Sequence, residues 1–216
     1  MNVQRLRNEL HHVFSGKSSV RFGGTIQSIA GYLGNGQASS PAIENQKQFK
    51  REEEERLIDF ISSNGLWLGD IDFTQYISEG AEQRVFLKDN RHVIKLNDGI
   101  YYRCWLDYLQ NLLLHNYFFS DTAYDLLGFT KEGEKLFSVV RQNFVSTDSV
   151  TDIERVRMFM TANGFRNVRN NDYIHDDLGI ILEDLHDENV LTRNDVLYFI
   201  DTVFYTTSAF WNEPAK

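Results

Sequence analysis

Hydrophobic residues recur every three or four positions in four stretches of the chain, and this spacing predicts four helices. The first is short and amphipathic, and its apolar side is formed by Val3, Leu6, Leu10 and Val13. The second is expected over residues 44–63. It contains the charge run REEEER, which we expect on its solvent-facing side.

The two later helices are expected at 101–116 and just after Thr151. The first of these has the strongest apolar periodicity in the chain, typical of a helix packed in a core. Thr151 and Glu154 have the spacing of a capping box, which would open the second helix, and Gly164 would end it.

Short segments of alternating apolar and polar residues predict antiparallel strands between these helices. We expect strands at 73–77, 83–88, 91–96, 124–130, 135–141, 180–182 and 196–200. Helices and antiparallel strands in this order place the protein in the α+β class.

Residues 15–40 are rich in glycine and serine, which predicts a long linker, interrupted at most by a short helix near 25–33. The chain is therefore expected to consist of an N-terminal helical extension with this linker at 1–63 and a main domain at 64–216.

Composition narrows the classes of function. The 216 residues carry 31 acidic and 22 basic side chains, a net charge of −9, which repels nucleic acid and anionic membranes. No apolar stretch approaches the roughly 20 residues that cross a bilayer, and no secretory signal is recognisable. A single cysteine, Cys104, predicts a reduced thiol. A cytoplasmic protein without a nucleic-acid or membrane partner is expected.

The segments EDLHDENVL and LYFIDT contain the most informative side chains. Asp184 and Asn189 lie five residues apart on a polar loop, and Asp201 closes the strand that follows. One Asp can orient a hydroxyl group, while an Asn and a second Asp offer the hard oxygen ligands that magnesium prefers.

These motifs resemble the protein-kinase-like superfamily. D-L-H-D-E-N at 184–189 is similar to the family's D-L-x-x-x-N, and I-D-T at 200–202 is similar to its D-F-G. Upstream and in the family's order, EGAEQRVF resembles the glycine loop with Gly80 and Val85, and H-V-I-K resembles V-A-I-K with Lys95.

The resemblance extends over roughly 65–202 and is nearest to the small kinase-like domain of polyvalent proteins from phages and conjugative elements. It implies a minimal kinase fold with a reduced C-terminal lobe and an ATP- and magnesium-dependent phosphotransferase. Lys95 would hold phosphates, Asn189 and Asp201 would hold magnesium, and Asp184 would orient the acceptor. Gly80 and Val85 would contact the nucleotide, as would a hinge at 140–144 that includes Asn143.

The sequence also departs from the kinase pattern. Leu182 and Glu183 replace the usual His-Arg pair, and the helix at 101–116 lacks a glutamate to pair with Lys95, which leaves Asp107 as the nearest carboxylate candidate. Few residues follow Asp201, so a substrate-binding lobe of normal size is not expected. A pseudokinase-like binding module, or a piece of a larger polyvalent protein whose neighbours bind the acceptor, therefore stays open.

Each motif taken alone has an ordinary structural interpretation. An Asp and an Asn in a polar loop often form turns, a lysine at the end of a strand often reaches to solvent, and Gly80 fits a plain hairpin. The histidines have no metal-ligand spacing, and Gly16-Lys17-Ser18 lacks the first glycine of a P-loop. The order of the motifs, rather than any one of them, supports the kinase hypothesis.

Overall fold

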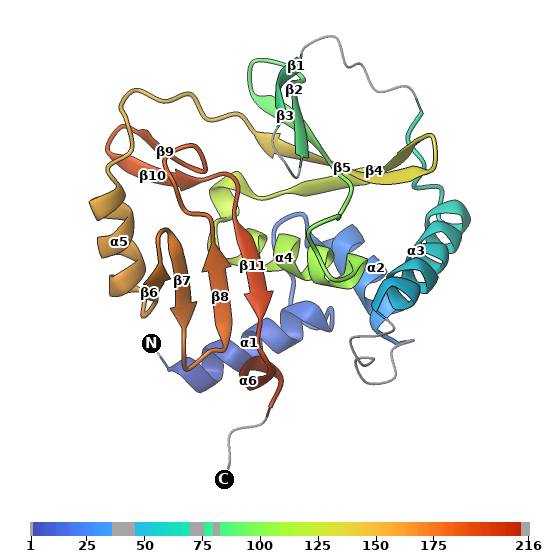
Figure 1. Cartoon of the computed structure of the whole chain (residues 1–216), viewed down its shortest axis with the longest axis horizontal. Coiled ribbons are helices and arrows are strands. Elements are labelled where there is room, and N and C mark those ends of the chain that lie inside the picture. Colours follow the sequence, from blue (N-terminus) through green and yellow to red (C-terminus); the bar gives the residue numbers. More distant parts are fainter. Residues whose placement is uncertain (1, 36–45, 70–75, 80–82, 213–216) are drawn as a thin grey trace.

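The computed structural model describes residues 2–35, 46–69, 76–79 and 83–212 (Figure 1). Its helices are α1 (Val3–Phe14), α2 (Gly23–Gly34), α3 (Gln46–Ser63), α4 (Trp105–Phe118), η2 (Ser120–Thr122), α5 (Ile153–Ala162) and α6 (Ser208–Trp211). Its strands are β1 (Tyr76–Glu79), β2 (Gln83–Leu87), β3 (His92–Asn97), β4 (Asp125–Glu132), β5 (Lys135–Asn143), β6 (Arg166–Arg169), β7 (Asp172–His175), β8 (Ile180–Glu183), β9 (Val190–Arg193), β10 (Val196–Phe199) and β11 (Val203–Thr206).

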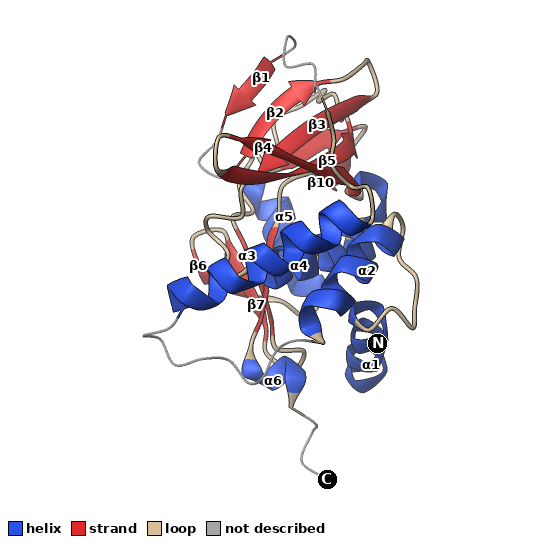
Figure 2. Cartoon of the chain, turned by 90° about the vertical axis from the view of Figure 1, so that its right-hand side faces the viewer, coloured by secondary structure: helices blue, strands red, loops and turns tan. Residues whose placement is uncertain are grey.

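A five-stranded antiparallel sheet forms one end of the molecule, in the order β1-β2-β3-β5-β4. Figure 2 shows it above the helices, with α4 running beneath it. Its outer face has a small apolar cluster of its own, made by Phe86, Ile94, Leu96, Phe137 and Val139. The strands predicted at 83–88, 91–96, 124–130 and 135–141 are confirmed, whereas most of the strand predicted at 73–77 lies outside the described residues.

Helix α4 is the central helix of the fold. Trp105, Tyr108, Leu109 and Leu113 are all at most 2% exposed, as the apolar periodicity predicts. The helix begins at Trp105 rather than at Tyr101, whose side chain is exposed. A periodic apolar residue just before a helix continues the sequence pattern without belonging to the helix.

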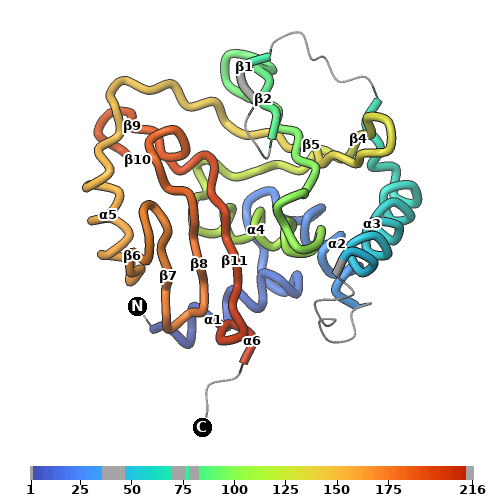
Figure 3. The backbone as a smooth tube through the Cα atoms, in the orientation of Figure 1, coloured from blue at the N-terminus to red at the C-terminus, as the bar shows by residue number. Residues whose placement is uncertain are grey.

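The C-terminal half is built from short strands. A four-stranded antiparallel sheet has the order β11-β8-β7-β6, and β9 and β10 form a separate hairpin. Figure 3 shows the chain leaving β8, turning through this hairpin and returning as β11 beside β8. The sequence predicted β8 and β10 but not the other four strands, and all six have only four residues each.

The N-terminal helices join the main core. Leu10, Ile26, Leu57 and Ile61 are fully buried and belong to the same apolar cluster as α4 and β11. The short helix expected near 25–33 is confirmed and spans Gly23–Gly34.

The expectation that the REEEER run faces solvent is wrong at one position. Glu53 is 2% exposed, and its Oε2 accepts a hydrogen bond of 2.6 Å from the backbone N–H of Trp105. Glu53 thus supplies an acceptor to the otherwise unpaired first turn of α4, and burial raises its pKa above the ordinary value.

The predicted capping box at α5 is also wrong. Asp152 is the N-cap and accepts from the N–H of Glu154, whereas the Thr151 hydroxyl hydrogen-bonds that of Thr192. The start of α5 is therefore shifted by one residue. Among the described residues, no helix is long and apolar enough to cross a membrane.

Candidate functional site

Two paired strands bring the candidate residues of the C-terminal half to one place. In the β8–β11 register, Glu183 lies opposite Val203, so Asp184 leaves β8 just where the segment of Asp201 and Thr202 enters β11. Asp184 has a positive φ of 68°, a conformation that Asp tolerates better than most residues, and this turns the loop away from the sheet.

The β9–β10 hairpin adds Asn189 to this group. Its backbone carbonyl accepts from the N–H of Ile200 at 2.9 Å and of Asp201 at 3.4 Å. Asn189 Nδ2 also donates to the backbone carbonyl and to Oδ2 of Asp184, both at 2.9 Å. The amide group of Asn189 therefore fixes Asp184 and leaves its own Oδ1 as an acceptor with no partner among the described residues.

Lys95 reaches the same segment from the upper sheet. It is 3% exposed, and its Nζ donates to the carbonyl of Ile200 at 2.8 Å and lies 3.8 Å from Oδ2 of Asp201. Burial lowers the pKa of Lys95, and the negative charge of Asp201 acts against that shift. A buried ammonium group next to a half-buried carboxylate thus joins the two halves of the molecule.

The same face of the sheet carries further residues of the site. Val85 lies directly opposite Lys95 on β2, and Val140 lies opposite it on β5, so the three side chains form one row across the sheet. Two residues before Val85, Gln83 also faces this side and donates from Nε2 to Oδ2 of Asp201.

Comparison with known proteins then identifies the family. The pattern of the serine/threonine/tyrosine kinases found in polyvalent proteins matches residues 50–208, most of the chain. The chain belongs to this family. Neither a search of curated proteins nor a search of solved structures gave a match. The kinase-like domain predicted from the motif order is thereby confirmed, as is the α+β fold.

Within this kinase-like domain, Lys95 has no carboxylate partner on α4 among the described residues. Asp107 instead binds Arg103, whose Nε donates to its Oδ2 at 2.7 Å. Asp107 therefore does not serve as the counter-charge of Lys95, and Asp201 does. The lysine is held by the acidic segment itself rather than by the helix.

Three upstream side chains hold the backbone around Asp201 in the kinase-like domain. The Thr122 hydroxyl donates to the carbonyl of Phe199, and the Tyr124 hydroxyl donates to that of Ile200 at 2.9 Å. His115 Nε2 donates to the Thr122 carbonyl at 2.9 Å, which leaves Nδ1 to accept from the Thr202 hydroxyl at 2.7 Å. Complete burial lowers the pKa of His115 to about 3, so the ring is neutral at pH 7.

The sequence did not single out Gln83, Tyr124, Thr122 or the role of His115. Their partners lie 76 to 118 positions further along the chain, so the spacing of residues within one segment could not predict these contacts. The only sequence signal is the position of His115 and Tyr124 on either side of the turn between α4 and β4.

The family resemblance also predicted that Asn143 and Gly80 contact the nucleotide. Asn143 ends β5, and its Nδ2 donates to the carbonyl of Asp121 at 2.9 Å, which ties the strand end to η2. Gly80 lies outside the described residues.

The donors of the site are of the kind that magnesium takes. Asn189 Oδ1 and the carboxylate of Asp201 are hard oxygen ligands on adjoining strand ends. No group of three or more His, Cys, Asp or Glu side chains suited to a metal occurs in the part of the chain that the structure describes. A magnesium ion here would thus depend on phosphate and water oxygens for its other ligands, as is usual for this ion.

Proposed function

We propose that the protein is an ATP- and magnesium-dependent phosphotransferase. One observation carries the proposal: a buried lysine from the sheet lies beside Asp201, and Asn189 links the segment of Asp201 to Asp184, in the kinase order along the chain. Family membership independently supports a kinase-type function.

Each residue has a role that its surroundings favour. Lys95 positions the phosphates, because an ammonium group has three donors and only one of them is needed for the carbonyl of Ile200. Asn189 and Asp201 would hold magnesium, which neutralises charge on the phosphates. The side chain of Asp184 is 58% exposed and is held by Asn189, so it can orient an acceptor hydroxyl that arrives from solvent.

The adenine base would lie under the sheet next to this row. Val85 shares a face and a register position with Lys95, which suits an apolar ceiling over a base. The end of β5 at Asn143 would form the hinge. The N–H of Phe144 donates to the carbonyl of Arg91, which makes these two residues a hydrogen-bonded pair of the antiparallel ladder. Because hydrogen-bonded and non-hydrogen-bonded pairs alternate, the neighbouring pair of His92 and Asn143 is not hydrogen-bonded, and the backbone N–H and carbonyl of Asn143 point away from β3. Gly80 belongs to the loop that we expect over the phosphates.

The acceptor side of the reaction can be tested with isosteric variants in one loop. Purified protein is incubated with γ-labelled ATP and magnesium, and label is followed on the protein and on lysate components. We expect Asp184→Asn to reduce transfer at least about a hundredfold, because it removes a general base. The matched control Asp187→Asn, three residues further on and 59% exposed, should retain transfer.

Calorimetric titration of ATP with and without magnesium tests the nucleotide side. Magnesium-dependent binding that weakens at least tenfold in Asp201→Asn is expected. The absence of ATP binding to folded wild-type protein would refute the proposal.

A second candidate is a kinase-like module that binds nucleotide or a protein partner without transferring phosphate. Its specific support is that Oδ2 of Asp201 is already engaged by Gln83 and Lys95, and that α4 provides no glutamate. Magnesium-dependent ATP binding without transfer, unchanged in Asp184→Asn, would favour this candidate. Tight binding of a protein partner that survives Asp184→Ala combined with Asp201→Ala would do so as well.

A further inference from the structure

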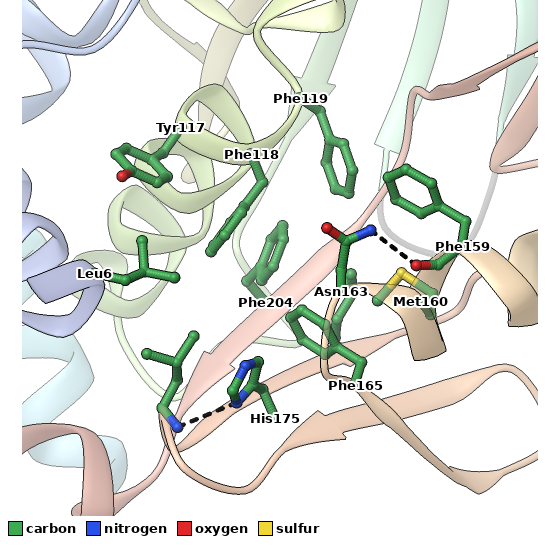
Figure 4. A pocket seen from close by; sticks show the side chains of 12 residues that line it. Leu6, Tyr117, Phe118, Phe119, Phe159, Met160, Asn163, Phe165, His175 and Phe204 are labelled. Carbon is green, nitrogen blue, oxygen red and sulfur yellow. Dashed lines mark hydrogen bonds between the residues drawn. The ribbon is translucent and has the colours of Figure 1, made fainter. Parts of the chain in front are cut away.

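A cavity lies away from the cluster of Lys95, Asp184, Asn189 and Asp201. It has a volume of about 250 Å³ and is enclosed by α1, the end of α4, α5 and the sheet of β7, β8 and β11. Figure 4 shows that most of its wall is aromatic, with Phe118, Phe119, Phe165 and Phe204 around the centre and Leu6 at one side. None of the residues that line it is Lys, Arg, Asp or Glu.

One buried polar group in this wall lacks a partner. His175 is 6% exposed, and its Nδ1 accepts from the backbone N–H of Leu178 at 3.3 Å, so in the neutral ring Nε2 carries the hydrogen. Nε2 has no hydrogen-bond partner among the described residues. His175 is one of the residues that line the cavity (Figure 4).

The backbone at Gly164 keeps Nε2 accessible. A Cβ atom on this glycine, which has a φ of +85°, would lie 2.8 Å from Nε2 and cover it. Asn163 next to it donates from Nδ2 to the carbonyl of Phe159 at 2.8 Å, which leaves its Oδ1 as an acceptor; Figure 4 shows this oxygen on the cavity side. Besides the hydroxyl group of Tyr117, the lining of the cavity thus offers one donor, on His175, and one acceptor, on Asn163.

We propose that this cavity binds a neutral aromatic molecule of one or two rings that carries a hydroxyl or carbonyl group. The rings pack among the phenylalanines, edge or face, and the oxygen accepts from His175 Nε2. An apolar cavity of about 150 Å³ is known to hold benzene, so this larger one has room for a ring with a substituent. A charged ligand is excluded because no opposite charge lines the wall.

This site is separate from the proposed phosphotransfer site. Leu182 of β8 and Phe204 of β11 line the cavity, whereas Asp184 and Asp201 lie beyond the ends of these strands. The proposal does not rest on phosphotransfer, and a protein without kinase activity would still bind the aromatic ligand.

Calorimetric titration of the full chain with phenol, toluene and benzoate tests the proposal. We expect saturable binding of one phenol per chain, about tenfold weaker binding of toluene, which lacks the oxygen, and no saturable binding of benzoate. Failure of both phenol and toluene to saturate the folded protein at millimolar concentration would overturn the proposal.

Two variants locate the ligand. His175→Phe keeps a ring but removes the donor, so phenol should bind only as weakly as toluene. Leu6→Trp extends a larger side chain into the cavity from α1 and should abolish binding of both. The matched control Asn8→Trp adds the same group to the exposed side of α1 and should leave both affinities unchanged. Phenol affinity unchanged in folded Leu6→Trp would overturn the assignment to this cavity.

Discussion

Lys95 is the residue at which the two halves of the molecule meet, and its surroundings combine opposing effects. Burial disfavours its charge, while Asp201 and the carbonyl of Ile200 favour it. The pair lies at 3.8 Å rather than in direct contact, so the carboxylate compensates only part of the desolvation cost. We therefore expect the charge of Lys95 to add little to the stability of the fold.

We expect Lys95→Met to leave the melting temperature unchanged or raised at pH 7, while ATP affinity falls at least about tenfold. Binding calorimetry and thermal unfolding measure the two effects. Wild-type protein that is more stable than the variant by more than about 1 kcal/mol at pH 7 would show that the ion pair dominates instead.

The same variant has a defined pH dependence. The folded-state pKa of Lys95 lies below the unfolded value of 10.5, so the unfolded chain binds more protons between these two values. Wild-type stability therefore gains from Lys95 as pH rises through this window, and any advantage of Lys95→Met should shrink from pH 7 to pH 10.5. Urea unfolding of both proteins at the two pH values checks this.

His115 makes the stability of the protein depend on pH in the acidic range. The folded protein takes up a proton on this ring only near pH 3, whereas the unfolded chain does so at about 6.5. Protonation of this ring therefore lowers the free energy of unfolding as pH falls from 6.5, and the full loss is reached only below pH 3. At pH 5 the loss is about 2 kcal/mol. Urea unfolding measures how much stability is lost between pH 7 and pH 5. This loss should be smaller by about 2 kcal/mol in His115→Gln than in the wild type, and should be unchanged in His12→Gln, on the exposed side of α1.

At the scale of single residues, the sequence predicted four polar or charged residues of the site but not the neighbours that hold them. Lys95, Asp184, Asn189 and Asp201 were predicted from the order of short motifs, and the structure brings them together. Their roles toward nucleotide and magnesium stay predictions. Gln83 was not predicted, because its contact with Asp201 spans 118 residues and depends on the folded topology.

At the scale of elements, α3 and α4 are linked by a side chain that the sequence pattern misplaces. Glu53 lies in a run of four acidic residues, and only the crossing of the two helices decides which one is buried. Nearby, Lys50 Nζ donates to the carbonyls of Gly99 and Tyr102 at 2.7 and 2.9 Å. Two side chains of α3 therefore fix the start of α4: Glu53 accepts from a backbone N–H, and Lys50 donates to backbone carbonyls of the preceding loop.

Removal of this acceptor should be costly. We expect Glu53→Ala to lower the free energy of unfolding by about 2–3 kcal/mol, because the N–H of Trp105 is left buried and unpaired. Glu53→Gln keeps an acceptor and should cost less than about 1 kcal/mol. Chemical denaturation compares both with Glu55→Ala, an exposed residue of the same run, which should change stability by less than about 0.5 kcal/mol. Equal effects at positions 53 and 55 would contradict this role of Glu53.

The elements that the sequence missed share a physical cause. Strands β6, β7, β9 and β11 have four residues each, too few for alternation to be distinguished from a polar loop. Strands β8 and β10 are equally short but coincide with the continuous apolar runs at 180–182 and 197–200. The missed strands are stable because they pair with neighbours and cover the core, for instance through Phe204 on β11. Helix α4 was predictable because its 14 residues are long enough for the helical spacing of its apolar residues to be recognised.

At the scale of the whole molecule, the predicted division at residue 64 crosses a continuous core. Side chains of α1, α2 and α3 are buried in the same apolar cluster as α4, β8 and β11. The family match also begins within α3, at residue 50. The N-terminal helices thus complete the core of the kinase-like domain.

We expect a fragment of residues 64–216 to unfold without a cooperative transition or to aggregate, because it exposes the apolar face that α2 and α3 cover. Calorimetry and size-exclusion chromatography compare it with the full chain. A monomeric fragment with a sharp transition near that of the full chain would contradict the single core.

The bond from Lys95 to Ile200 spans 105 residues and has a consequence for synthesis on the ribosome. At about 5–20 residues per second, strand β3 emerges roughly 5 to 20 seconds before its acidic partner has been translated. During that interval the ammonium group has no protein carbonyl or carboxylate from this segment to bind and stays in water. The contacts of Lys95 with Ile200 and Asp201 can therefore form only after translation has passed residue 201.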